Sequence, residues 1–347
     1  MKPTLPAISC RPKPLAATQG QPANRTRTQK GAALLMALLT VALIAVLASS
    51  ALWQQWRTLS VETAERDAQQ AHWLLVGAQD WSRVVLREDG RSGNTDHLAE
   101  PWATPLREAR LSSFLAAAPG GTLTLRDNLA EQVFLSGRIS DMQARLNVAN
   151  LVTGGSLNSA ELRSFVRLYQ LLNLPEAELL VWSKALEAAL QTTPKLNAPL
   201  PPQRLEQLGW LGISPRSLAR LSPYITVLPS ATPVNINTAS AEVLSASVPG
   251  LNLAAAQNWV RERNKQPFEN LENLRSRMGA DTLGLSDSRH SVNTRYFEVV
   301  GQLRQNEVSV LQRALVVRDG VETKTVWREV RPLLGEPGCL STIEPPC

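Results

Sequence analysis

The sequence lacks the short motifs that mark the common enzyme classes. It contains no HExxH, GxSxG, GxGxxG or Walker A pattern, and its three histidines, His72, His97 and His290, lie far apart. Cysteine is also scarce, and the three cysteines form no CxxC pair. We therefore expect no catalytic residues and no bound cofactor.

Acidic residues are absent from the first 31 positions, which carry six basic residues: Lys2, Arg11, Lys13, Arg25, Arg27 and Lys30. All 30 acidic residues lie after this segment, where the remaining Lys and Arg residues balance them. A nucleic-acid-binding protein normally carries its basic excess on the folded domain. The net charge of +6 therefore comes from a basic leader and does not indicate DNA binding.

Charge is absent altogether from Ala32 to Leu52, a run of 21 residues. A helix needs about 20 apolar residues to cross a bilayer. Because basic flanks stay on the cytoplasmic side, the rest of the chain should lie outside the cytoplasm. The alternative is a cleaved secretory signal, with Ala48–Ala51 as its small-residue cleavage site.

Proline and glycine are absent from Ala32 to Val76, and a helical pattern continues past the apolar run. Small and apolar residues recur every three or four positions at Ala64, Ala68, Ala71, Leu75, Ala78, Ser82 and Val85. This pattern favours one helix of roughly 55 residues, apolar in its first half and amphipathic in its second, over a signal peptide.

The remaining chain has the pattern of strands, then helices, then strands. We expect a loop region over 89–121 with one short helix around Leu106–Ala117. Strands are expected at Gly121–Leu125, Gln132–Ser140, Ala144–Ala149, Arg295–Leu303, Val308–Arg318 and Thr323–Arg331, and helices at Ser159–Leu172, Glu176–Gln191, Arg204–Leu208 and Pro215–Leu221. Asp319-Gly320 is a hairpin-turn signal. The predicted fold class is α+β, with a helical domain inserted into an antiparallel sheet.

Residues 234–279 resemble a helix-hairpin-helix module. Its first helix should start after Asn237 or Thr238, either of which is a good N-cap, and Pro249-Gly250 should form the turn. The second helix is expected from Leu253 to Asn264. The residues expected to face the core or to close the module are Ala256, Trp259, Val260, Phe268 and Leu271.

Modules of this kind often bind DNA phosphates through backbone N–H groups of a glycine-rich hairpin, as in membrane-anchored competence proteins. A DNA-binding protein of that type is therefore an alternative function. Here the hairpin lacks a second glycine, and Arg261, Arg263 and Lys265 fit a solvated face. We expect the module to serve protein–protein contact, without nucleic acid as a partner.

Two of the cysteines, Cys339 and Cys347, lie eight positions apart. In an oxidising compartment they are expected to form a disulfide around a small loop. The alternative is a pair of free thiols.

A basic leader ending in Gly31, followed by an uncharged helix and an amphipathic half-helix, resembles a type IV pilin or pseudopilin precursor. The resemblance implies that a prepilin peptidase cuts after Gly31 and that the new N-terminus, Ala32, is methylated. Most pilins carry Glu at the fifth mature position, where it neutralises the N-terminal ammonium of a neighbouring subunit. This position is Met36 here, which suits only the top of a fibre.

Five stretches resemble, in order, the type II secretion system protein K family of minor pseudopilins (the general secretion pathway protein K family). They are Gly77–Trp81, Gly137–Val148, Leu221–Pro229, Val234–Ala239 and Tyr296–Gly301. The resemblance implies that the antiparallel sheet packs on the amphipathic half of the long N-terminal helix, over Leu75. It also implies a function: capping the tip of the pseudopilus and starting its assembly, for export of folded proteins across the outer membrane. A minor pilin of a type IV pilus is an alternative.

The organisation implied by the resemblance is a leader at 1–31, a transmembrane helix at 32–52 and its amphipathic continuation at 53–88. A pilin-like α+β domain follows at 89–150 and 293–332, interrupted by an inserted helical domain at 151–292, with a tail at 333–347. The implied location is the bacterial inner membrane, with one span and a periplasmic body. Expected partners are the other minor pseudopilins, the major pseudopilin, the prepilin peptidase, the inner-membrane assembly platform, secreted substrates and the outer-membrane channel.

Calcium binding is also known in this family. Many members carry an acidic Asp-Trp-Ile-Asp-x-Asp stretch in the inserted domain. Here the corresponding stretch, Leu180–Ala185, contains no carboxylate. Because calcium sites need several oxygen ligands, usually including more than one carboxylate, the sequence does not predict calcium at this place.

Overall fold

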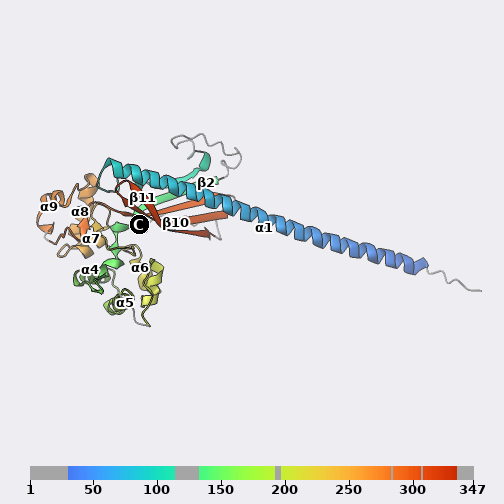
Figure 1. Cartoon of the computed structure of the whole chain (residues 1–347), viewed down its shortest axis with the longest axis horizontal. Helices are drawn as coiled ribbons and strands as arrows, with labels where there is room; N and C mark the ends of the chain where they lie inside the picture. Colours follow the sequence, from blue (N-terminus) through green and yellow to red (C-terminus); the bar gives the residue numbers. More distant parts are fainter. Residues whose placement is uncertain (1–29, 114–132, 192–196, 283, 306–307, 334–347) are drawn as a thin grey trace, which may run out of the picture. The chain divides into compact units, whose positions relative to one another are not determined.

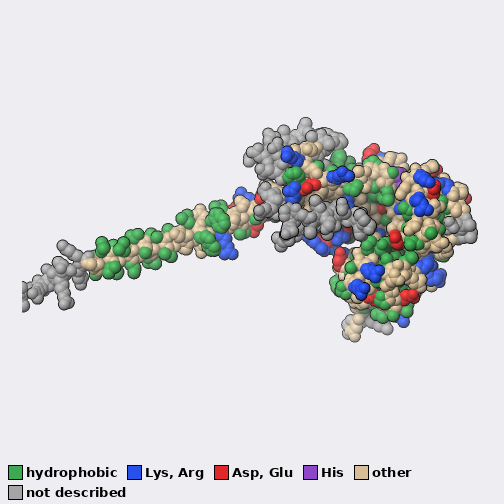
Figure 2. Space-filling view, turned by 180° about the vertical axis from the view of Figure 1, so that it is seen from behind, with side chains coloured by type: hydrophobic (Ala, Val, Ile, Leu, Met, Phe, Trp, Pro, Cys, Tyr) green, Lys and Arg blue, Asp and Glu red, His purple; other side chains and the backbone are tan. Residues whose placement is uncertain are grey.

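The computed structural model describes residues 30–113, 133–191, 197–282, 284–305 and 308–333. It begins with helix α1, Lys30–Ser92, which is 63 residues long. The chain divides into two compact units, residues 1–63 and 64–347. In the first unit every described residue belongs to α1, whose stretch 32–52 is uncharged and exposed. On the face that Figure 2 shows, many hydrophobic side chains lie along this part of the helix. A helix that is apolar all round suits a membrane rather than water.

The second unit contains a five-stranded antiparallel sheet in the order β1-β2-β9-β10-β11. The strands are β1 (Leu106–Arg110), β2 (Val133–Asp141), β9 (Tyr296–Gln305), β10 (Val308–Asp319) and β11 (Glu322–Leu333). The turn between β10 and β11 follows the predicted Asp319-Gly320 signal. Gly320 is the first of its two loop residues and has a φ of 59°, a left-handed conformation that glycine adopts without a steric cost.

The second half of α1 packs on one face of this sheet (Figure 1). Its buried positions are Ala71, Leu75, Gln79, Ser82 and Leu86. Leu75 contacts the sheet as expected, whereas Ala64 and Ala68 of the predicted stripe are exposed. The helix therefore meets the sheet only from Ala71 onward.

Strands β2 and β9 pair along their whole length, from Val133↔Gln305 to Asp141↔Phe297. The chain between them forms the helical insertion, whose helices gather beside the sheet in Figure 1. Its main helices are α4 (Ser159–Leu171), α5 (Glu176–Ala189), α6 (Pro215–Leu221), α7 (Ala241–Ser247), α8 (Leu253–Lys265) and α9 (Leu271–Met278). Short 3-10 segments, among them η4 (Leu205–Leu211), connect them.

The insertion has its own core, separate from the clusters under α1. The largest side chains buried in it are Phe165, Tyr169, Trp182, Trp259 and Phe268. Trp182 donates its indole N–H to the Tyr169 hydroxyl at 2.8 Å, so both polar groups are satisfied inside the core. The predicted α+β class, with a helical domain inserted into an antiparallel sheet, is confirmed.

Three local predictions are wrong. Leu106–Arg110 is an edge strand and not the start of a helix, because it pairs with β2. Only Leu146–Asn147 of the strand expected at Ala144–Ala149 is extended; Asp141 and Asn147 cap 3-10 turns there by accepting from the Gln143 and Ala149 N–H groups. The N-cap of α7 is Ser240, and not Asn237 or Thr238. The strand predicted at Gly121–Leu125 lies outside the described residues.

Candidate functional site

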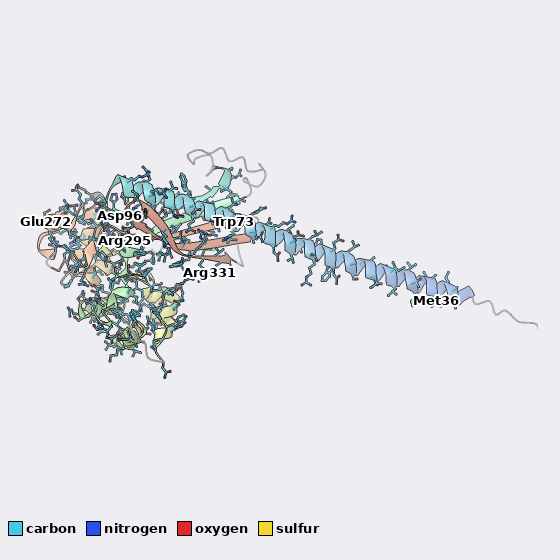
Figure 3. The ribbon with its side chains drawn as sticks, viewed as in Figure 1. Met36, Trp73, Asp96, Glu272, Arg295 and Arg331 are labelled. Atoms are coloured by element: carbon cyan, nitrogen blue, oxygen red, sulfur yellow. The ribbon has the colours of Figure 1, made fainter. Side chains whose placement is uncertain are left out.

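The predicted processing residues lie at the start of α1. Gly31, Ala32 and Met36 are all helical and exposed (Figure 3). Among the described residues, α1 is the one helix that is long and apolar enough to cross a membrane, and none of its most apolar window is buried in the protein. This agrees with a membrane anchor. Cys339 and Cys347 lie outside the described residues.

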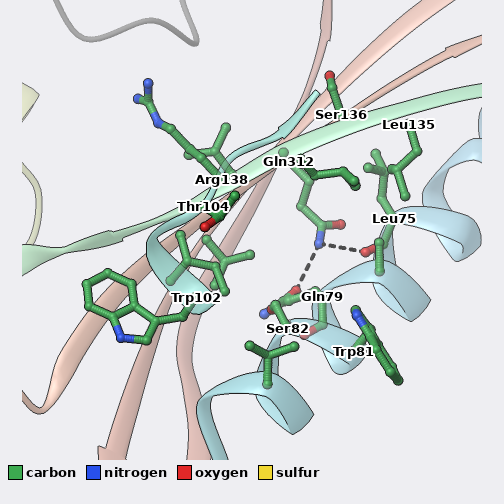
Figure 4. Close-up of a pocket in the computed structure, with 18 of the residues that line it drawn as sticks. Leu75, Gln79, Trp81, Ser82, Trp102, Thr104, Leu135, Ser136, Arg138 and Gln312 are labelled. Atoms are coloured by element: carbon green, nitrogen blue, oxygen red, sulfur yellow. Dashed lines mark hydrogen bonds between the residues drawn. The ribbon is translucent and has the colours of Figure 1, made fainter. Parts of the chain in front are cut away.

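A pair of glutamines forms the polar centre of the interface between α1 and the sheet. Gln79 on α1 and Gln312 on β10 are 2% and 4% exposed. Gln312 Nε2 donates to Gln79 Oε1 at 2.8 Å and to the Leu75 carbonyl at 3.3 Å (Figure 4). Gln79 Nε2 donates in turn to the Thr325 hydroxyl of β11 at 3.1 Å. These bonds fix the rotation of α1 on the sheet, because a buried amide is costly without partners.

Sequence reasoning missed Gln79, although a signal for it exists. It lies four residues after the buried Leu75, and Leu86 lies four residues after the buried Ser82. Residues three or four apart share one face of a helix. The pattern of small residues drew attention to Ala78, which is only half-buried, in place of its larger polar neighbour.

A cavity of about 200 Å³ lies beside this pair, between α1 and strands β2 and β9. Paired glycines on the two strands, Gly137 and Gly301, line it. A Cβ at Gly301 would come within 3.2 Å of Leu75 Cδ2, so the glycine allows the helix to approach closely. No Asp, Glu, His, Cys or Lys occurs among the described residues that line the cavity. The cavity therefore offers no acid, base or metal ligand of those types for catalysis.

The junction between sheet and insertion is built around the buried carboxylate of Asp141, at the end of β2. This carboxylate accepts hydrogen bonds from the Thr238 hydroxyl, from the Thr294 hydroxyl at 2.7 Å and from Asn235 Nδ2 at 2.9 Å. Burial raises the pKa of Asp141 to about 6, against the opposing effect of these hydrogen bonds. The Asp141 side chain therefore connects the end of β2, where the chain enters the insertion, with Thr294, just before β9, where the chain returns to the sheet.

Arg318 on β10 extends this junction to the end of α1. Its guanidinium pairs with Asp89, on α1, and with Asp96, in the loop that follows; all three side chains are at most 8% exposed. The second oxygen of Asp96 accepts from the Thr294 backbone N–H at 2.7 Å. Burial, followed by the negative charge of Glu100, raises the pKa of Asp89 to about 6. Two buried ion pairs therefore connect α1, the sheet and the entrance to the insertion.

Asp89, Asp96 and Glu100 are also the one described group of acidic side chains close enough to share a metal ion, with ligand atoms within 4.8 Å of one another. Arg318 already neutralises two of these three carboxylates, so a cation would compete with a buried guanidinium. The stretch without carboxylates, Leu180–Ala185, lies in α5, where Leu180 and Val181 are exposed and Trp182 is in the core.

The helix-hairpin-helix segment folds largely as predicted, with α7 and α8 joined through Gly250 at a φ of 84°. Ala256, Trp259 and Phe268 are fully buried. Asn237 is not a cap; its amide both donates to and accepts from the Phe268 backbone and so ties the two ends of the module together.

The basic residues of the module are engaged within it. Arg263 is 6% exposed and donates to the Ile236 carbonyl. Lys265 pairs with Glu262 at 2.7 Å, and Arg261 donates to Asn258. A phosphate-binding surface needs cations that are free to face the ligand. The DNA-binding alternative is therefore not favoured.

Comparisons with known proteins agree with this architecture. Residues 234–293 match the family model described as "Type II secretion system (T2SS), protein K". The type II secretion system protein K of Pseudomonas aeruginosa is 28% identical over 320 residues, covering 83% of this chain and 90% of the relative. The protein of the same name from Pectobacterium carotovorum subsp. carotovorum is 25% identical, covering 87% of this chain and 96% of the relative.

A solved structure has a similar fold. It is the crystal structure of the GspK-GspI-GspJ complex from the enterotoxigenic Escherichia coli type 2 secretion system. One of its chains aligns with a TM-score of 0.59 and 17% identity, covering 77% of this chain and 98% of that chain. A long N-terminal apolar helix packed on an antiparallel sheet defines the class, which is that of the pseudopilins.

Within that class, the chain is similar to the type II secretion system protein K family. It is a minor pseudopilin of the type II secretion system, and its family is structural.

Proposed function

We propose that this pseudopilin caps the tip of the pseudopilus and starts its assembly, acting through contacts and not through catalysis. Met36 is the observation that carries the proposal. In a fibre, a Glu at this position neutralises the N-terminal ammonium of the neighbouring subunit, and a thioether cannot do so. A subunit with Met36 suits the one place where no neighbour stands above it.

The size of the helical insertion supports the same position. It occupies the chain between Asp141 and Tyr296 and has a core of its own. The buried junction at Asp141 holds it firmly on the sheet. A domain of this bulk is accommodated at the end of a fibre more easily than within its packed wall.

The proposed partners are other minor pseudopilins, as in the GspK-GspI-GspJ complex of the structural relative. A face of α1 offers a surface for them: Trp73 is 69% exposed, and Gly77 and Trp81 follow at four-residue intervals (Figure 3). A Cβ at Gly77 would meet nothing within 4 Å, so packing within this chain gives no reason for a glycine. A helix of a partner could approach closely there, flanked by aromatic rings.

The remaining steps follow from the class. The prepilin peptidase would cut after Gly31 and methylate Ala32, and α1 would hold the subunit in the inner membrane, with its body in the periplasm. The assembly platform would then pass the tip complex to the major pseudopilin. The tip would contact secreted substrates or the outer-membrane channel.

The first test is the mass and N-terminal residue of the mature protein, purified from cells that contain a prepilin peptidase. We expect a start at methylated Ala32. A start near Ser49 or Leu52 would instead mean a secretory signal, and an uncut chain would mean a plain membrane anchor. Either of those results would contradict processing as a pseudopilin.

A Met36→Glu substitution tests the tip position. At the tip, the new carboxylate finds no ammonium and costs on the order of 2–3 kcal/mol in the membrane. We expect co-purification of the other minor pseudopilins to fall about tenfold or more. Met36→Leu is the matched control and should leave co-purification unchanged. If Met36→Glu assembles as well as the wild type, the missing Glu is incidental and the tip assignment loses its main support.

A further inference from the structure

The cavity between α1 and strands β2 and β9 lies over a row of the sheet that carries few side chains. Gly137 on β2, Gly301 on β9 and Gln312 on β10 are paired in register and form one row across three strands. Gln312 donates to the Leu75 carbonyl of α1, so this row faces the helix. The two glycines add no side chain beside Gln312, and the cavity of about 200 Å³ lies there.

The side-chain carbonyl oxygen of Gln312 lacks a hydrogen-bond donor. Gln312 is 4% exposed, and its buried Oε1 accepts from no group of the described chain. The orientation of this amide is determined by its neighbours: Nε2 donates to Gln79 Oε1, which also accepts from Arg328 Nε and cannot donate. Figure 4 shows the amide among the lining side chains, with its nitrogen bonded to Gln79 and to Leu75. A buried acceptor without a donor is costly, so Oε1 favours a ligand that donates.

Most of the cavity wall is apolar, and part of it is aromatic. Leu75, Leu135, Trp102 and Val299 line it and are each at most 8% exposed, and Trp81 lines it from α1. An apolar cavity of about 150 Å³ is large enough to hold benzene. The cavity of this protein therefore has room for one small ring, which its aromatic walls would contact favourably.

The same wall disfavours charged ligands. No carboxylate occurs among the described residues that line the cavity, so a ligand cation would lose its hydration without gaining an ion pair. An ionised carboxylate has no proton to donate to Gln312 Oε1. A ring with a neutral hydroxyl has both an apolar body and a donor. Pro101, Thr104 and Leu106 line the cavity and are exposed, so it opens to solvent on their side.

We propose that this cavity binds a neutral phenol group, with the ring between α1 and the sheet and the hydroxyl donating to Gln312 Oε1. The phenol belongs either to a free small molecule or to a tyrosine side chain of another polypeptide, and the chemistry in the cavity is the same for both. Trp81 connects the site with the proposed partner face of α1, because it lies four residues after Gly77. Such binding does not depend on whether the subunit stands at the tip of the pseudopilus.

The test uses the full-length chain in detergent and para-fluorophenol, with binding followed by the line width of the fluorine NMR signal. We expect saturable binding. Ala78→Leu places a larger side chain on the helix wall of the cavity and should weaken binding about tenfold or more. Gly301→Ala narrows the cavity from the sheet, where its Cβ would lie 3.2 Å from Leu75 Cδ2, and is used if Ala78→Leu does not fold.

Ala68→Leu is the matched control for Ala78→Leu. It is the same substitution on the same helix, at an exposed position outside the cavity, and should leave binding unchanged. Uptake of the ligand by detergent micelles is common to all variants, so only the differences between variants report on the cavity. Equal binding by the wild type, Ala78→Leu and Gly301→Ala would overturn the proposal, because the ring would then lie in the micelle and the cavity would hold water alone.

Gln312→Met tests the role of the acceptor. The variant keeps a long side chain but removes Oε1. It should weaken binding of para-fluorophenol about fivefold to tenfold, the effect of one hydrogen bond, and change binding of para-fluorotoluene less than about twofold. Equal losses for the two ligands would overturn the assignment of the hydroxyl to Gln312.

Competition identifies the source of the phenol. Displacement of para-fluorophenol by N-acetyltyrosinamide, lost in Ala78→Leu, would assign the cavity to a tyrosine side chain of another polypeptide. Displacement by para-cresol alone, which is the tyrosine side chain without its backbone, would assign it to a free small molecule. Displacement by neither compound would overturn the proposal.

Discussion

A Gly31→Leu chain is expected to keep its basic leader and to support no secretion above the level of a strain that lacks the protein. Peptidases of this class recognise the glycine before the cut, and a branched side chain there should block cleavage. Gly31 is exposed, and a Cβ at this position would meet nothing within 4 Å. The substitution therefore disturbs no packing within the chain, and any loss reports on processing alone.

The measurement is the mass of the protein recovered from membranes, together with the amount of a secreted substrate in the medium. Gly77→Ala is the control for cleavage, because it also replaces an exposed glycine of α1 and its Cβ would meet nothing within 4 Å. It is not a control for secretion, because Gly77 lies in the proposed partner surface. The Gly77→Ala chain should lose its leader normally. If the Gly31→Leu chain were trimmed at the same bond and supported secretion, processing of the pilin type would be wrong for this protein.

Replacing Arg318 with methionine is expected to lower the free energy of unfolding by about 3–5 kcal/mol. The substitution leaves the carboxylates of Asp89 and Asp96 buried without their cation. It also removes a hydrogen bond to the Thr294 carbonyl. Because these contacts join α1, the sheet and the entrance to the insertion, we expect the whole second unit to be destabilised.

The loss of unfolding free energy caused by Arg318→Met should depend on pH. The pKa of Asp89 in the folded chain is raised to about 6, so protonation favours the folded state. The contribution of Asp89 protonation to the free energy of unfolding is fully present below pH about 4 and is lost as the pH rises through about 6. Without Arg318, whose hydrogen bond and positive charge lower the pKa of Asp89, the folded state depends still more on protonation of Asp89. The loss should therefore be smaller at pH 5 than at pH 8.

Urea unfolding followed by tryptophan fluorescence provides the measurement. The matched control is Arg304→Gln, which breaks the pair with Glu108 on the same sheet; these side chains are 30% and 32% exposed. An exposed pair contributes only about 0–1 kcal/mol. Arg318→Lys keeps the positive charge and is used if Arg318→Met does not fold. Its free energy of unfolding should fall by less than that of Arg318→Met. Similar losses for Arg318→Met and Arg304→Gln would show that the buried junction contributes no special stability.

Elements that depend on neighbouring residues were predictable from the sequence. Helix α4 begins after Asn158, whose side chain accepts from the Ala160 and Glu161 N–H groups. The hairpin between β10 and β11 follows its Asp319-Gly320 turn. The uncharged run also locates the long apolar helix without any tertiary information, and cleavage after Gly31 stays a prediction. These signals are local because capping, turn geometry and membrane insertion act within a few residues or within one helix.

Contacts between distant residues were not predictable in this way. Asn237 and Thr238 have the chemistry of N-caps, yet their side chains bond to Phe268 and Asp141, and Ser240 caps α7 instead. Arg263 reads as a solvated cation but is buried against the Ile236 carbonyl. The hydrogen-bond partner of a polar side chain depends on which groups the fold brings close to it. The sequence alone does not show which groups these are.

The sequence by itself determined the class of this protein: a basic leader, a long helix that is first apolar and then amphipathic, and strands that enclose a helical insertion. Only the tertiary structure decided how these parts join. The pairing of β2 with β9, the burial of Gln79 against Gln312, and the ion pairs of Arg318 all connect residues more than 150 positions apart. Such contacts form because burial in the folded chain makes unpaired polar groups costly, and they leave no periodic pattern in the sequence.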